Sequence, residues 1–118
     1  MTKHELEKRL VDFSVSVLEL IQSIEKNAVT TPLGNQVIRS STASALNYGE
    51  AQSAESKKDF VHKIGIVLKE LRETQINLMI LGNLKSFNDR IEFPQLIKEN
   101  DELIAIFHKT IQTARKNI

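Results

Sequence analysis

The sequence predicts an all-α fold, an antiparallel up-down-up-down four-helix bundle in which residues 1–118 form a single domain. Three observations predict this fold. Apolar residues recur at alternating steps of four and three along four segments, which is the period of packed amphipathic helices. Only four glycines and two prolines interrupt the chain, and no segment alternates as a strand would. Helices of about 20 to 28 residues with short connections form antiparallel bundles.

The first helix is predicted over residues 3–26. Thr2 and Glu5 have the spacing of a capping box, in which the Thr oxygen accepts a backbone N–H, so the helix is expected to begin near Lys3. Its apolar stripe is Leu6, Leu10, Phe13, Val17, Leu20 and Ile24.

The second helix is predicted over residues 32–52, with Thr31 as N-cap and Pro32 at the first helical position, where no N–H is needed. Its middle, residues 40–45, is almost entirely Ser, Thr and Ala. Because small side chains allow another helix to approach closely, we expect the tightest packing of the fold here.

The third helix is predicted over residues 54–83 and is expected to start between two capping serines, Ser53 and Ser56. Its stripe is Phe60, Ile64, Val67, Leu71, Thr74, Leu78 and Leu81, and it is also apolar outside the stripe, at Val61, Ile66, Leu68, Ile76, Met79 and Ile80. A helix that is apolar on several faces is buried on several sides, which a small monomeric bundle does not provide. This pattern predicts a homo-oligomer.

Residues 83–92 are polar and aperiodic, which predicts a loop, and the fourth helix is predicted over residues 94–116 with Pro94 at its start. Phe93, Ile97, Asn100, Ile104, Phe107, Ile111 and Ala114 continue the alternating spacing.

The composition narrows the class of protein. A charge of +1 with 41% hydrophobic and 26% charged residues is typical of a globular domain and gives no global case for nucleic-acid binding. The absence of Cys excludes disulfides and thiol chemistry, and we expect a cytoplasmic location. The mixed charges of residues 1–10 argue against a secretory signal, and apolar runs far below the ~20 residues of a bilayer span argue against a membrane partner.

The sequence contains no motif that predicts catalysis. Nucleophile elbows, phosphate loops and dinucleotide fingerprints are absent, so we assign no catalytic residue and no cofactor. One Asp-x-x-His pair, Asp59 and His62, distantly resembles half of a di-metal site, but without a second half we interpret it as a helix cap beside an exposed His and assign no metal. A deep polar pocket lined by groups with shifted pKa values would favour the hypothesis that the protein is an enzyme.

Basic residues cluster at the start of the third helix: Lys57, Lys58, Lys63, Lys69 and Arg72, against the acids Asp59 and Glu70. Repeated around an oligomer, this excess would form a basic belt that attracts phosphate. The alternative is a solvated helix face with local ion pairs, such as Lys69 with Glu73.

Polar residues also mark the two central helices: Arg39, Asn47, Glu50, Glu70 and Glu73. If these helices pack antiparallel, Arg39 is expected to reach Glu70 or Glu73. We interpret the set as a structural network that fixes helix register or subunit pairing, in preference to a ligand pocket.

Residues 39–60, RSSTASALNYGEAQSAESKKDF, followed by Lys63, Lys69-Glu70 and Glu73-Thr74, closely resemble the 23S rRNA-intervening-sequence protein family, also called four helix bundle proteins. The resemblance implies a bacterial, non-enzymatic protein that assembles as a homopentameric ring. It also implies a fold similar to that of diversity-generating-retroelement accessory proteins, which are basic rings that bind nucleic acid.

Two hypotheses for function follow. In the first, an oligomer presents Arg39, Lys57, Lys58, Lys63, Lys69 and Arg72 to RNA or another nucleic acid without reading bases. In the second, the protein is a scaffold that binds a protein partner, and its basic residues are only solvated.

Overall fold

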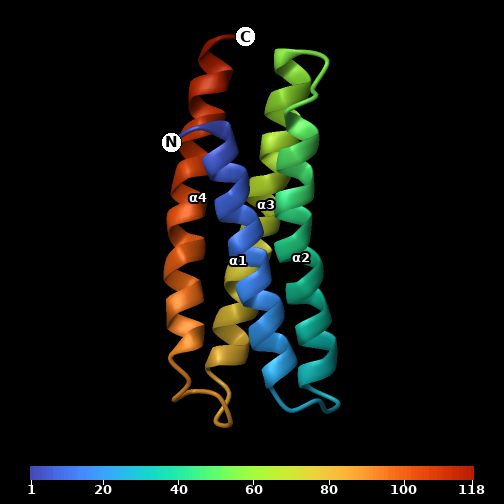
Figure 1. The fold of residues 1–118 in the computed structure, drawn as a ribbon, viewed down its shortest axis with the longest axis vertical. Helices are drawn as coiled ribbons and strands as arrows, with labels where there is room; N and C mark the ends of the chain where they lie inside the picture. Colours follow the sequence, from blue (N-terminus) through green and yellow to red (C-terminus); the bar gives the residue numbers. More distant parts are fainter.

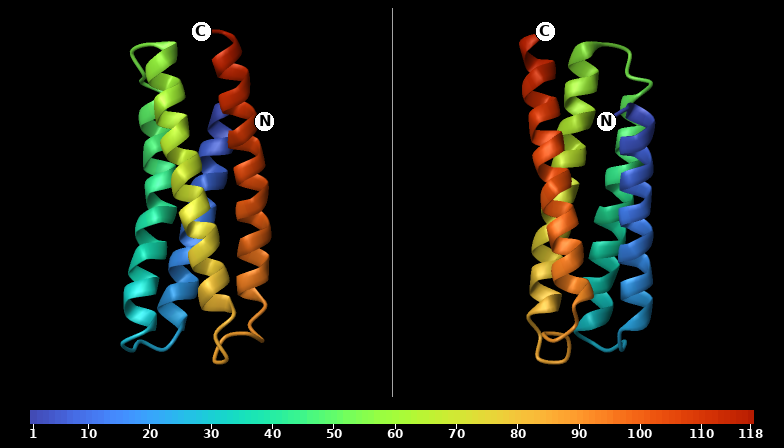
Figure 2. Two further views of the ribbon diagram at one scale, coloured as in Figure 1. Left: turned by 180° about the vertical axis from the view of Figure 1, so that it is seen from behind. Right: turned by 60° about the vertical axis from the view of Figure 1, so that its left-hand side comes forward.

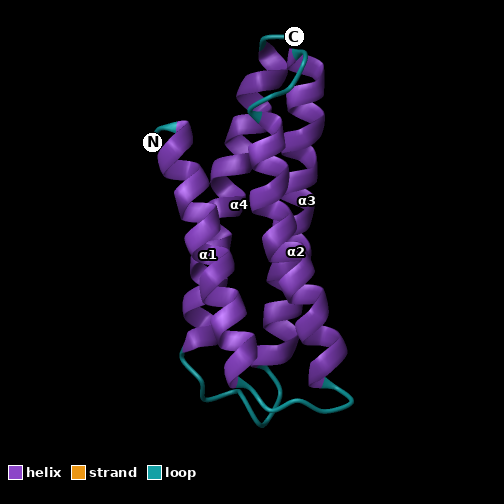
Figure 3. Ribbon diagram, turned by 45° about the vertical axis from the view of Figure 1, so that its right-hand side comes forward, coloured by secondary structure: helices purple, strands orange, loops and turns teal.

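The computed structural model describes residues 1–118 and contains four α-helices and no strand. The helices are α1 (Lys3–Ser23), α2 (Thr30–Ala51), α3 (Lys57–Gly82) and α4 (Glu92–Lys116). They run alternately up and down along one axis, with the loops confined to the two ends of the molecule (Figures 1 and 3). The predicted all-α four-helix bundle is therefore confirmed.

Each helix packs on its two neighbours in a cyclic order, and the backbones of the diagonal pairs α1/α3 and α2/α4 stay apart. The α2/α3 pair is the most extensive and the α1/α4 pair the least, and the bundle measures 47 × 21 × 20 Å (Figure 2). The central hairpin of α2 and α3 is thus the firmest part of the fold, and α1 is secured mainly through α2.

The predicted apolar stripes form the core. All six residues of the first stripe are buried, as are Ile64, Val67, Leu71 and Leu78 on α3. On α4, Phe107 is fully buried and meets Tyr48 edge to face, with ring centroids 5.3 Å apart. The 22 buried hydrophobic residues form one cluster, as expected when four stripes converge on a single axis.

Asn100 is the exception among the stripe residues of α4, because it is a fully buried amide. Its Nδ2 donates to the Leu71 carbonyl oxygen at 2.8 Å and to Gln75 Oε1 at 2.9 Å, while its Oδ1 has no partner. An amide bonded to the α3 backbone at one position fixes the register of α4 against α3.

The small residues of α2 lie where α2 meets both neighbours. Ser40, Ser41 and Ser44 are fully buried. The Ser40 and Thr74 hydroxyl oxygens lie 2.7 Å apart, and Ser14 Oγ on α1 donates to the Ser41 carbonyl oxygen at 2.9 Å. Such short contacts to two helices are possible only because this part of α2 carries no long side chain.

The predicted boundaries between α1 and α2 were wrong by a few residues. α1 ends at Ser23 and not at residue 26, because Ile24 is extended and buries its side chain. α2 begins at Thr30, and the predicted cap Thr31 donates its amide to the Asn27 carbonyl oxygen inside the first turn. The capping side chain is Asn27, whose Oδ1 accepts from the amides of Val29 and Thr30, and Pro32 is therefore the third residue of the helix, within its first turn.

The starts of α3 and α4 also differ from the prediction. α3 begins at Lys57 and not at residue 54, because only Ser56 caps it, accepting from the Asp59 amide at 3.0 Å, while Ser53 lies in the preceding turn. α4 begins at Glu92 and not at Pro94, which occupies the third helical position, where a missing N–H is still tolerated. At the start of α1, the Thr2 hydroxyl oxygen accepts a hydrogen bond from the Glu5 amide, as predicted.

The connection between α3 and α4 is anchored more firmly than a polar loop would be. Phe87 is buried and stacks on Phe93, with ring centroids 5.9 Å apart. Gly82 ends α3 where a Cβ atom would lie only 2.9 Å from Phe93 Cβ. The turn is therefore held by two phenyl rings and requires a residue without a side chain beside them.

Candidate nucleic-acid interface

One face of α3 points away from the bundle along its whole length. An α-helix turns by about 100° per residue, so residues 11, 14 and 18 positions after Lys58 return to nearly the same side. The exposed large residues on this side form a set that we call the α3 outer stripe: Lys58, His62, Lys69, Arg72, Ile76, Met79 and Ile80. The stripe is basic in its first half and apolar in its second.

The three basic residues of the stripe carry uncompensated charge. Lys58, Lys69 and Arg72 are exposed, and none of them forms an ion pair. The local pair with Glu73, considered for Lys69, is not formed, because the Glu73 carboxylate binds Arg39 instead. Charges without an internal partner remain free to attract an external anion.

Beside the stripe, α2 and α3 enclose a shallow groove of about 840 Å³. Three cationic side chains line it, Arg39, Lys69 and Arg72, against one carboxylate, Glu73. Gln36 and Asn77 add neutral polar groups. The groove is open, positively charged and suited to contact with an extended anionic chain more than to enclosing a small molecule.

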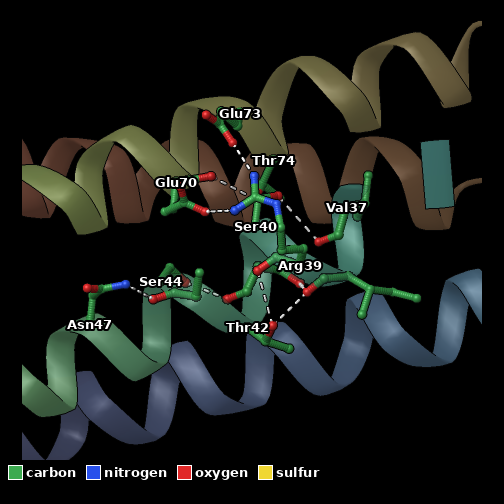
Figure 4. A network of polar contacts seen from close by, with 12 residues as sticks. Val37, Arg39, Ser40, Thr42, Ser44, Asn47, Glu70, Glu73 and Thr74 are labelled. Carbon is green, nitrogen blue, oxygen red and sulfur yellow. Dashed lines mark hydrogen bonds and ion pairs between the residues drawn. The ribbon is translucent and has the colours of Figure 1, made fainter. Parts of the chain in front are cut away.

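Arg39 joins α2 to α3 at this groove, as the antiparallel packing predicted. Its Nη1 donates to Glu70 Oε2 at 2.8 Å and its Nη2 to Glu73 Oε2 at 2.5 Å, with the guanidinium between the two carboxylates (Figure 4). The hydrogen bond to Glu73 and the attraction of Glu70 raise the pKa of Arg39 above its ordinary value. Both carboxylates bind the Arg39 guanidinium, and Arg39 therefore bridges α2 and α3.

Glu70 is the buried end of this bridge. Its side chain is only 8% exposed, whereas that of Arg39 is 59% exposed. One turn further along α3, Thr74 Oγ1 donates to the Glu70 carbonyl oxygen at 2.9 Å and contacts Ser40. A polar chain thus runs from the surface of the groove to the centre of the α2/α3 contact (Figure 4).

The remaining polar residues that the sequence grouped with Arg39 lie elsewhere. Asn47 Nδ2 donates to the Ala43 carbonyl oxygen of its own helix at 2.8 Å. Glu50 Oε1, next to the last residue of α2, lies 3.5 Å from Lys63 Nζ of α3. The five polar residues therefore form two separate ion-pair groups and one helix-internal bond, and only Arg39, Glu70 and Glu73 are connected.

Two of the candidate basic residues point away from the stripe. Lys63 turns towards α2 and Glu50, and Lys57 Nζ donates to the Asn117 carbonyl oxygen at 3.1 Å, beyond the end of α4. The six predicted cations therefore do not form one belt on a single chain. Lys58, Lys69 and Arg72 lie on the outer stripe, and Arg39 flanks it across the groove.

Asp59 and His62 occupy the positions expected of a cap and an exposed His. Asp59 lies in the first turn of α3 behind its cap Ser56, and His62 lies on the outer stripe. The structure contains no group of three or more His, Asp or Glu side chains placed to hold a metal ion. None of the four helices has a stretch long and apolar enough to cross a membrane.

Sequence reasoning did not identify the polar contacts between α1 and α4. Arg9 donates to both oxygens of Glu99, at 2.7 and 2.6 Å, and Arg90 Nη2 binds Glu92 and Ser23. Arg9 thus connects α1 with α4, and Arg90 connects the last residue of α1 with the loop that precedes α4. The Arg9 and Glu99 partners are 90 residues apart in the chain, so no local spacing could have indicated the contact.

The fold and this surface define the class of protein: an all-α antiparallel four-helix bundle with a basic outer face and no recognisable catalytic constellation. The model of the 23S rRNA-intervening sequence protein family matches residues 2–109, and the chain belongs to this family. The resemblance inferred from residues 39–60 is therefore confirmed.

One solved structure illustrates the shared fold. It is a protein of unknown function from the S23 ribosomal protein family of Bacteroides thetaiotaomicron, which superposes with a TM-score of 0.84 at 24% sequence identity over 95% of this chain and 99% of that one. A likeness at this identity establishes the fold alone. The comparison with curated proteins finds no match.

Proposed function

We propose that this protein is a non-enzymatic homo-oligomer that binds the phosphate backbone of RNA through the basic half of the α3 outer stripe. The observation that carries the proposal is the set of three exposed cations, Lys58, Lys69 and Arg72, that share one side of α3 and have no ion-pair partner. The absence of cysteine suits action in the cytoplasm, where RNA is available.

The spacing of these cations suits a polynucleotide. Lys58 and Arg72 are 14 residues apart, which is about 21 Å at 1.5 Å per residue. Successive phosphates of one strand of B-form DNA advance by about 3.4 Å along the axis, so this length is comparable to roughly six phosphates of a polynucleotide backbone. A contact surface made of long flexible cations along a helix binds backbone charge without reading bases.

Self-association is the second part of the proposal. A single chain offers only three unpaired cations on the stripe, and non-specific nucleic-acid affinity grows with the number of phosphates neutralised. An oligomer, a pentameric ring in the form that the family resemblance implies, multiplies the stripe around one particle. The exposed apolar second half of the stripe, Ile76, Met79 and Ile80, supports assembly.

Replacing both Lys69 and Arg72 with Gln is expected to weaken RNA binding and to reduce its salt dependence. Each lost contact to single-stranded RNA lowers the slope of log K against log salt concentration by about 0.7, so the double variant should lose about 1.4. Fluorescence anisotropy of labelled RNA, titrated at several salt concentrations, measures both quantities. Sedimentation of the variant verifies that its assembly is unchanged.

The matched control replaces Lys98 and Lys109 with Gln. These two exposed lysines of α4 form no ion pair, so their removal changes the net charge equally on another face. The control should retain the wild-type slope. If both variants lost the same amount of slope, RNA would be attracted by the overall charge of the protein and not by the α3 outer stripe. If the wild-type protein bound no RNA at low salt, the proposal would be rejected in favour of a scaffold that binds a protein partner.

A further inference from the structure

The two carboxylates that bind Arg39 differ in how much the fold depends on them. Glu70 is nearly enclosed, with 8% of its side chain exposed, and a buried carboxylate without a cationic partner is strongly destabilising. The Glu73 side chain is 38% exposed and is partly solvated by water. An exposed ion pair of this kind contributes little to stability. The fold therefore requires the contact of Arg39 with Glu70, and the contact with Glu73 is dispensable.

The two carboxylates also differ in their position relative to the α2/α3 groove. Glu73 lines the groove and is the only acidic residue that does so, whereas Glu70 is not part of the lining. The cations of the lining are Arg39, Lys69 and Arg72. Lys69 and Arg72 have no ion-pair partner, so the single negative charge of the groove is placed on Arg39. Glu73 thus removes one of three positive charges from the surface that faces an anionic ligand.

The Arg39 guanidinium has donor groups to spare on its groove side. One Nη1 bond holds Glu70 and one Nη2 bond holds Glu73, and Figure 4 shows the guanidinium between them. A guanidinium carries five N–H donors, and the Arg39 side chain is 59% exposed. Phosphate and carboxylate oxygens accept from a guanidinium in the same way. A phosphate oxygen can therefore take the place of the Glu73 oxygen while Glu70 keeps its own bond.

We propose that Arg39 is a latent phosphate ligand of the groove, which Glu73 withholds from RNA. This inference rests on the proposed RNA binding and identifies the residue that limits its affinity. The chemical class of the ligand is a backbone phosphodiester, and its contact would be the Nη2 edge of Arg39 that Glu73 now occupies.

Glu73 retains the guanidinium in the wild-type protein because it belongs to the same folded chain. A tethered group has a much higher effective concentration at its partner than a free ligand has. A phosphate that approaches Arg39 must also overcome the repulsion of a carboxylate that is already there. Wild-type RNA binding should therefore use the three unpaired cations, Lys58, Lys69 and Arg72, and leave Arg39 out.

Replacing Glu73 with Gln tests the inference, because Gln keeps the size of the side chain and removes its charge. The slope of log K against log salt concentration for single-stranded RNA should become steeper by about 0.7, the value of one added phosphate contact. The advantage of the variant over wild type should therefore shrink about fivefold for each tenfold rise in salt. Fluorescence anisotropy with the same labelled RNA measures both quantities.

The matched control is Glu19→Gln. Glu19 is an exposed residue of α1 that forms no ion pair, so its replacement changes the net charge of the protein equally and leaves the groove as it is. The control should keep the wild-type slope. Circular dichroism and sedimentation verify that both variants are folded and assembled as wild type is.

A second substitution, Arg39→Met, shows whether the gain depends on Arg39. In the Glu73→Gln chain it should remove the whole gain in slope, whereas in the wild-type chain it should change the slope very little. This non-additivity is the signature of two groups that act on one another. If the double variant does not fold, adding Glu70→Gln removes the buried charge and allows the same comparison.

Three results would overturn the inference while RNA binding itself stands. Glu73→Gln could leave the slope unchanged, Glu19→Gln could raise it equally, or the gain could persist after Arg39→Met. The first would show that Arg39 does not bind phosphate even when it is free, and the other two that the gain is a general effect of charge. If neither wild type nor Glu73→Gln bound RNA at low salt, the proposed function would be rejected together with the inference.

Discussion

Replacing Arg39 with Met lowers the free energy of unfolding by about 1–3 kcal/mol, the usual cost of leaving a buried acceptor without its donor. Glu70 is the reason. Its carboxylate is 8% exposed and binds the Arg39 guanidinium at 2.8 Å, and Met fills the same space without a charge. The exposure of Arg39 itself keeps the loss below that of a fully buried pair, because water partly replaces the cation. Urea denaturation measures the change.

Two further variants identify the cause. Adding Glu70→Gln to the Arg39→Met chain should recover part of the stability, because the buried charge is then removed together with its partner. Arg72→Met, which lines the same groove from α3 but forms no ion pair, should change stability by no more than about 0.5 kcal/mol. If Arg72→Met lowered the free energy of unfolding equally, or if Glu70→Gln recovered none of it, the ion pair between Arg39 and Glu70 would not be the source of the lost stability.

The same Arg39 variant separates the two roles that the sequence assigned to this residue. Because both carboxylates already hold the guanidinium, Arg39→Met should leave the salt dependence of RNA binding almost unchanged. A fall in the slope comparable to that of the Lys69 and Arg72 variant would place Arg39 among the phosphate contacts.

Substituting Ala for each of two glycines of α3 is expected to have opposite effects. At Gly82 the added methyl group would lie 2.9 Å from Phe93 Cβ, which is fixed to the backbone of α4, so α3 and α4 must shift at a cost of about 1–3 kcal/mol. At Gly65 the nearest atom, Ile111 Cδ1, is 3.7 Å away. There Ala should stabilise the helix by about 0.5–1 kcal/mol.

Thermal unfolding of the two variants provides the comparison within one helix. Gly82→Ala should lower the unfolding temperature, and Gly65→Ala should raise it. If Gly82→Ala raised the unfolding temperature as well, helix propensity would outweigh the contact with Phe93, and the turn before α4 would not depend on this close approach.

The sequence was sufficient to predict the helices and the core, because an amphipathic helix encodes its buried side by a local repeat. The stripes from Leu6 to Ile24 and from Ile64 to Leu81 needed no knowledge of their partners. The bridge from Arg39 was also predictable, since the short corner after α2 fixes the antiparallel register of the two helices.

Features that depend on distant partners or on competing caps were not predictable. Asn27 and Thr31 are both acceptable cap residues by type, and the choice of Asn27 depends on the extended backbone that buries Ile24. Phe87 has no apolar neighbours in sequence, and its burial depends on the ring of Phe93. The division of the basic residues among different sides of α3 follows from the helix start at Lys57 and the partners each side meets.

The central claim is that one helix face, the α3 outer stripe, serves assembly with its apolar half and RNA binding with its basic half. Sedimentation velocity of the wild-type protein with fluorescently labelled RNA tests both halves in one measurement. We predict that the label sediments with an oligomer at low salt, and that at high salt the free label separates from a protein that remains assembled. A monomeric protein, or a label that never sediments with the protein at low salt, would contradict the claim.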